Sequence, residues 1–124
     1  MLHVQEPWFT EIAAGRKTVE GRVGPQGKFD NMIGGQITLS SSDNRELKAR
    51  LVGVRHYPDL KSYLEAEGWE KTAPHTGSFA AAMAAYEAVE MHCFTDEMTQ
   101  KTVKVFAPER VAARGGINAV QLAI

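Results

Sequence analysis

Ala14-Gly15-Arg16-Lys17-Thr18-Val19-Glu20-Gly21-Arg22-Val23 is the stretch around which this chain is organised. Residues 7–14, which lead into this stretch, open with Pro7 and carry apolar side chains at helical spacing. They predict a short helix that Gly15 ends as a left-handed cap. From the threonine onward the pattern alternates, which predicts a strand with Glu20 and Arg22 on one face. Lys17 lies at the corner, where its long side chain could reach the same place.

The three charged side chains suit a ligand site. An arginine is a planar, permanently charged fork that fits carboxylate or phosphate, whereas a lysine is a point charge whose pKa falls near another cation. Glu20 lies between Lys17 and Arg22 and can hold both cations in place. The stretch therefore predicts a site in which the three side chains bind one ligand. The alternative is a solvent-exposed strand face whose charged side chains form ion pairs only with each other.

The composition predicts one folded domain over residues 1–124. With 44% hydrophobic and 23% charged residues, the chain can bury a single core. A net charge of −1 argues against clamping of long duplex by bulk electrostatics, because phosphate neutralisation needs many lysines and arginines. The lone Cys93 excludes an internal disulfide, and no apolar run approaches membrane length. We therefore expect a cytoplasmic protein that does not bind membranes.

Strand and helix patterns follow one another without βαβ repetition, which predicts an α+β fold. Asp59 and Ser78 are placed to cap two helices, the first of which ends at Gly68. We expect strands at 1–4, 36–40, 47–54, 103–106 and 117–124, with the last two completing the sheet, and loops at 28–35, where Phe29 and Ile33 turn inward, and at 107–116.

No cofactor motif or metal site is expected. The histidines and Cys93 show no metal-ligand spacing, and the glycines at 24, 27, 34 and 35 punctuate turns instead of opening a phosphate-binding helix. His75 precedes the Ser78 cap in a loop that could face the charged site.

The order Gly15-x-Lys17-Thr18-Val19-Glu20-x-Arg22 after an aromatic-bearing helix resembles the signature of the ASCH domain, a branch of the PUA-like superfamily. Residues 57–68 resemble the family's helix that ends in Glu-Gly. Ser78-Phe79 followed by Tyr86 resembles its next helix, and 117–124 resembles its closing strand. The resemblance covers most of the chain, with 87–115 matched least. It implies a PUA-like small β-barrel with flanking helices, in which the signature strand lines a cleft.

This resemblance implies that the partner is RNA or a nucleotide, such as a single-stranded segment or a modified nucleoside. Branches of the family bind RNA, cleave single-stranded RNA, deacylate acetylcytidine or act as coactivators. In the deacylase branch a nucleophilic threonine stands where this chain has Glu20, so deacylation by that route is not expected. The ligand-binding residues implied are Trp8, Lys17, Thr18, Glu20, Arg22, Ser78 and Tyr86, with Arg16, Lys28, Arg50 or Arg55 flanking the cleft.

Two alternatives stay open. The first is a small hydrolase acting on single-stranded RNA or modified nucleosides, with Lys17, Glu20 and Tyr86 as its catalytic residues. The second is a protein-interaction module in which the charged side chains only bridge each other. Trp8 and Tyr86 have two interpretations as well, since each is either a stacking surface for a base or part of the core.

Overall fold

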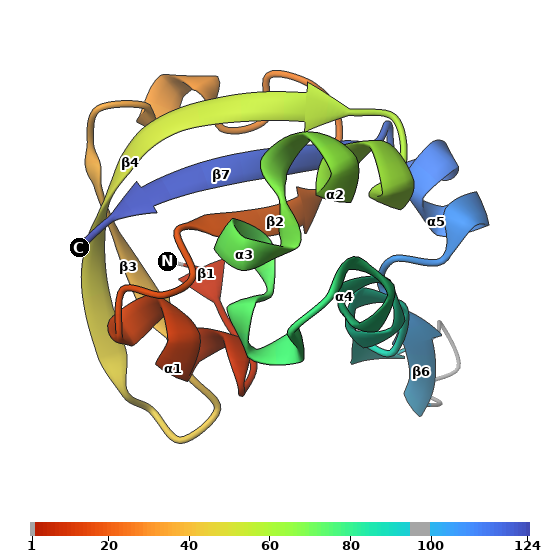
Figure 1. Ribbon diagram of the computed structural model, residues 1–124, viewed down its shortest axis with the longest axis horizontal. Helices are drawn as coiled ribbons and strands as arrows, with labels where there is room; N and C mark the ends of the chain where they lie inside the picture. Colours follow the sequence, from red (N-terminus) through yellow and green to blue (C-terminus); the bar gives the residue numbers. More distant parts are fainter. Residues whose placement is uncertain (1, 95–99) are drawn as a thin grey trace.

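The computed structural model describes residues 2–94 and 100–124. A five-stranded sheet with the strand order β1-β3-β4-β7-β2 forms its frame. The sheet is strongly curled, and α2, α3 and α4 gather along one side of it (Figure 1). The elements are β1 Leu2–His3, α1 Trp8–Ala13, β2 Val19–Val23, the 3-10 helix η1 Asp30–Met32, β3 Gln36–Ser40, β4 Glu46–Tyr57, α2 Leu60–Glu67, α3 Trp69–Thr72, the 3-10 helix η2 Pro74–Thr76, α4 Phe79–Glu87, β5 Glu90–Phe94, β6 Gln100–Lys104, α5 Pro108–Ala113 and β7 Ile117–Ala123.

The long strand β4 and the apolar strand β7 form the centre of the sheet. β3–β4, β4–β7 and β7–β2 are antiparallel pairs, while β1 pairs in parallel with β3. The pairing of β4 with β7 shifts register between Leu51 and Gly53, and such a bulge bends a strand and increases its twist. This curled half-barrel with flanking helices confirms the α+β, PUA-like expectation.

The predicted helix ends are confirmed in atomic detail. The Asp59 carboxylate accepts a hydrogen bond from the backbone N–H of Ser62 at 2.8 Å, and the Ser78 hydroxyl accepts one from Ala81 at 3.1 Å. Each bond satisfies a donor that the first helical turn leaves free. Gly68 ends α2 with a φ of 87°, a conformation that favours glycine. In the described parts of the chain, the helices are all too short or too polar to cross a membrane.

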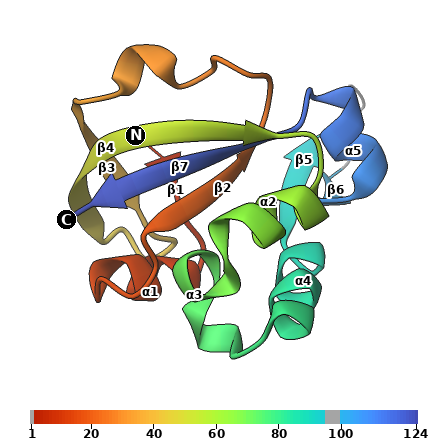
Figure 2. The same ribbon diagram turned by 45° about the horizontal axis from the view of Figure 1, so that its top comes forward.

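The prediction that residues 103–106 complete the main sheet is wrong. β6 instead pairs with β5 in a separate two-stranded sheet. Figure 2 shows this hairpin beside α5 at one end of the molecule, away from α1. Within the predicted loop 107–116 the chain forms α5, with Pro108 in the first helical turn. Alternation identifies a strand but not its partner, and six residues are too few for a helical period to stand out.

The predicted orientation of loop side chains is half right. Phe29 is buried, but Ile33 leaves 46% of its surface exposed at the end of η1. In α4, Phe79 is 37% exposed although Tyr86 is buried. A loop has no period that fixes the direction of its side chains, and Phe79 is the first residue of α4.

Gly21 in β2 permits a close contact between α2 and the sheet. A Cβ at this position would lie 2.9 Å from the hydroxyl oxygen of Tyr63, which α2 buries completely. The backbone of β2 and the ring of Tyr63 therefore touch only because the side chain between them is a hydrogen.

We expect Gly21→Ala to lower the free energy of unfolding by about 1–3 kcal/mol, the usual cost of overpacking a core. The matched control is Gly53→Ala, since the nearest atom to a Cβ there is 3.9 Å away. Urea unfolding followed by circular dichroism measures both variants. Equal stability of the two variants would contradict the close packing of Tyr63 on β2.

Candidate functional site

The turn between α1 and β2 directs Lys17 into the protein. Gly15 follows α1 with a φ of 80°, and the backbone N–H of Lys17 donates to the backbone carbonyl of Glu11 at 3.0 Å. The chain then enters β2, where alternation places Glu20 and Arg22 on the same face of the sheet. A helix end and a strand start thus bring three charges together within six residues.

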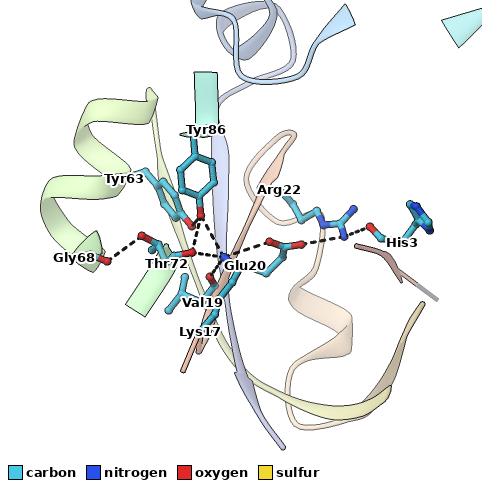
Figure 3. A network of polar contacts seen from close by, with 9 residues as sticks. All are labelled: His3, Lys17, Val19, Glu20, Arg22, Tyr63, Gly68, Thr72 and Tyr86. Atoms are coloured by element: carbon cyan, nitrogen blue, oxygen red, sulfur yellow. Dashed lines mark hydrogen bonds and ion pairs between the residues drawn. The ribbon is translucent and has the colours of Figure 1, made fainter. Parts of the chain in front are cut away.

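Lys17 is fully buried. Figure 3 shows the polar contacts that engage its ammonium group. Its ammonium group donates to the carbonyls of Val19 at 2.6 Å and Thr72 at 2.5 Å, and to the hydroxyl of Tyr86 at 3.2 Å. It also lies 3.5 Å from Oε1 of Glu20. The ammonium therefore ties β2, α3 and α4 to one carboxylate.

Burial lowers the pKa of Lys17 to about 8, because removal from water disfavours the charged form. The charge and hydrogen bond of Glu20 act in the opposite direction, and the positive charge of Arg22 adds to the lowering. Lys17 stays protonated at neutral pH. An uncompensated buried charge is costly, so Glu20 and the surrounding carbonyls are required for this arrangement.

Two tyrosines complete the wall around the ammonium. The hydroxyl of Tyr86 accepts from Lys17, donates to the Thr72 carbonyl at 3.2 Å and lies 2.9 Å from the hydroxyl of Tyr63. Burial raises the pKa of both tyrosines above the ordinary value, so both hydroxyls stay protonated. In this network both hydroxyls act as hydrogen-bonding groups.

Arg22 connects the two outermost strands of the curled sheet. Its Nη2 donates to the carbonyl of His3 in β1 at 2.6 Å and to Oε2 of Glu20 at 3.2 Å. β1 and β2 are the first and last strands of the sheet order, so this guanidinium bridges the gap at which the half-barrel stays open. Its Nε has no hydrogen-bond partner although it is enclosed.

A cleft of about 310 Å³ lies at this gap, within the size range of about 300–1,000 Å³ found for small-ligand sites. Glu20 and Arg22 face it from β2. The rings of Trp8 and Tyr86, with centroids 4.8 Å apart, belong to its wall, and Phe106 meets Tyr86 edge-on at 5.0 Å. The remaining lining residues are His3, Val4, Gln5, Gly21, Val23, Lys28, Val89, Met91, Val105 and Arg110.

The predicted site residues fall into three groups. Trp8, Glu20, Arg22 and Tyr86 line the cleft, whereas Lys17 does not line it but contacts Glu20, Tyr86 and the ring of Trp8 from behind. Thr18 joins the sheet through its backbone and Ser78 caps α4, and neither lines the cleft. The ring of His75 packs edge-on against Trp8 at 4.8 Å.

Of the predicted flanking cations, only Lys28 lines the cleft. Arg16 pairs with Glu11, and Arg55 pairs with Glu67 on the opposite face of the sheet from Glu20. Arg50 does not line it either. Phe106 and Arg110 were missed, since they come from the segment that the signature matches least. The arginine in the short helix α5 carries no signal in the sequence that would assign it to the cleft.

The described residues hold no group of three or more histidine, cysteine, aspartate or glutamate side chains that could bind a metal ion. The side chains of His92 and Cys93, which were considered for such a site, lie outside the described part of the structure.

We predict that the Lys17 ammonium titrates near pH 8, well below its ordinary value of 10.5. Between these values the unfolded chain binds more protons than the folded one, so the contribution of Lys17 to stability rises with pH across this window. The unfolding free energy of wild type minus that of Lys17→Met should therefore become more positive from pH 8 to 10.5. NMR of the lysine side chain, with Lys17→Met to assign the signal, measures the pKa. A flat difference together with titration near 10.5 would contradict the buried ammonium.

Comparison with known proteins gives this chain a family. The model of the ASCH domain matches residues 2–107. The crystal structure of the hypothetical protein PH0355 is similar, with a TM-score of 0.66 and 26% sequence identity over 98% of this chain and 94% of that one. The solution NMR structure of PF0455 from Pyrococcus furiosus shares the fold, with a TM-score of 0.60 and 21% identity over 98% and 92% of the two chains. No curated protein matches. Because the family match spans most of the residues, this chain belongs to the ASCH domain family.

Proposed function

We propose that this protein binds a nucleotide, free or within a short single-stranded RNA segment, in the cleft between β1 and β2. The observation that carries the proposal is the juxtaposition of a carboxylate and a guanidinium, Glu20 and Arg22, with an aromatic wall in one cleft. RNA or nucleotide recognition is also the role that membership of the ASCH family suggests.

The charges of the cleft favour an anionic ligand. Among the described residues, Arg22, Lys28 and Arg110 line it alongside the carboxylate of Glu20, and the protonated Lys17 lies directly beneath. Lys28 is exposed and forms no ion pair with any described residue, so it can approach a phosphate from the rim. Although the net charge of the chain is −1, the cleft is locally positive.

The aromatic wall suits a base. Trp8 and Tyr86 are only 8% and 2% exposed, yet both contribute to the lining of the cleft. Their burial supports a role in the core, and their position in the lining supports contact with a base. Stacking on aromatic rings is a common way to bind unpaired bases, because every base has a face that can stack.

Binding is favoured over turnover because two of the three candidate catalytic groups are already committed. The donors of Lys17 are occupied and its Nζ does not reach the cleft. The Tyr86 hydroxyl stays protonated within the same network. We therefore infer that Glu20, oriented by Lys17 and Arg22, acts as a hydrogen-bond acceptor for the ligand and that no reaction follows.

Fluorescence anisotropy with a labelled, mixed-sequence eight-nucleotide RNA tests the binding. We expect wild type to bind at low salt, and Lys28→Ala to bind about three- to tenfold more weakly with a shallower salt dependence, because one phosphate contact is lost. Lys48→Ala, which removes an exposed lysine of β4 outside the cleft, is the matched control and should bind like wild type. Absence of binding by wild type, or identical losses in the two variants, would refute the site.

Incubation with single-stranded RNA and with acetylated cytidine tests for turnover. We expect no product above the level of Glu20→Gln, which retains the shape of the side chain but removes its ability to accept a proton. Product that accumulates with wild type and disappears with Glu20→Gln would overturn the proposal in favour of the hydrolase alternative.

A further inference from the structure

Glu20 and Arg22 of β2 form the floor of the cleft. Their side chains offer a ligand acceptors and donors in a fixed order along the strand. Each oxygen of Glu20 faces one cation, Oε1 facing Lys17 at 3.5 Å and Oε2 facing Arg22 at 3.2 Å. A carboxylate oxygen has room for more than one donor, so both oxygens can still accept from a ligand. The carboxylate lines the cleft, while the donors of Lys17 are engaged within the protein.

Arg22 adds donors next to these acceptors. Both of its hydrogen bonds leave from Nη2, one to His3 and one to Glu20. Nε has no partner but is enclosed, and 26% of the Arg22 side chain is exposed, so a ligand would draw its hydrogen bond from Nη1. The floor thus presents the two carboxylate oxygens of Glu20 as acceptors. The guanidinium of Arg22, two residues further along β2, follows them as a donor.

We propose that the cleft selects guanine, an inference that rests on the proposed nucleotide binding. The Watson–Crick edge of guanine carries two adjacent donors, N1–H and the 2-amino group, beside the acceptor O6. The two donors match the two oxygens of Glu20, and O6 matches Arg22. Adenine, cytosine and uracil each place an acceptor where the second donor is needed. A carboxylate accepts only, so an acceptor opposite it is repelled.

The rest of the cleft is consistent with this placement. With the base edge against Glu20 and Arg22, the ring plane lies along the wall that contains Trp8 and Tyr86. The exposed ammonium of Lys28 lies over the ring of Phe29, 5.7 Å from its centroid, and lines the same cleft. The phosphate of a guanosine nucleotide can therefore meet a cation at the rim while the base occupies the floor.

Calorimetric titration of wild type with mononucleotides tests the proposal at the level of single groups. We expect GMP to bind about tenfold to a hundredfold more tightly than AMP, CMP or UMP, the range that one bidentate base contact provides. IMP, which lacks only the 2-amino group, should lose about tenfold. GMP methylated at N1 should lose most of its affinity, because the methyl group blocks the central donor.

Glu20→Gln and Lys48→Ala provide the protein side of the test. The glutamine amide replaces one acceptor by a donor, so the preference for GMP over AMP should disappear, whereas Lys48→Ala should retain it. The analogue series uses wild type alone, so it remains decisive even if Glu20→Gln does not fold. Equal affinity for the four nucleotides, or a preference for CMP, would overturn guanine selection while leaving nucleotide binding in place. Absence of binding to every mononucleotide and to the eight-nucleotide RNA would overturn both.

Discussion

The ion pair between the buried ammonium of Lys17 and the carboxylate of Glu20 joins the end of α1 to the strand β2. The ammonium is charged and fully buried, so it requires the carbonyls of Val19 and Thr72, the Tyr86 hydroxyl and a counter-ion. Meeting that requirement brings α3 and α4 against β2. The aromatic wall is thereby fixed beside the carboxylate, and the same contacts that stabilise the fold orient the candidate site.

Arg22 extends this constraint to the geometry of the barrel. A curled sheet that does not close leaves two edges with unpaired backbone groups, and here the guanidinium reaches from β2 to the His3 carbonyl in β1. The cleft lies at that gap, and Glu20 and Arg22, which line it, are held by hydrogen bonds and ion pairs within the protein. Preorganised groups of this kind lower the entropic cost of binding.

Local patterns in the sequence predicted the elements closest to the site, because their causes are local. The Gly15 cap, the alternation that pairs Glu20 with Arg22, and the caps at Asp59 and Ser78 each depend on a few neighbouring residues. The burial of Lys17 could not be predicted in this way, since the Thr72 and Tyr86 groups that hold it are 55 and 69 positions away. The partner of β6 and the position of Phe106 in the wall also depend on contacts remote in sequence. The position of Trp8, which is buried and also lines the cleft, could therefore be assigned only from the structure.

We propose that Glu20, held between Lys17 and Arg22, contacts the nucleotide bound in the cleft. A crystal structure of the protein grown with GMP tests it most directly. We expect a GMP molecule whose base has its donor edge within hydrogen-bonding distance of the Glu20 oxygens and whose phosphate lies towards Lys28. A nucleotide seated elsewhere on the protein, with Glu20 contacting only Lys17 and Arg22, would contradict it.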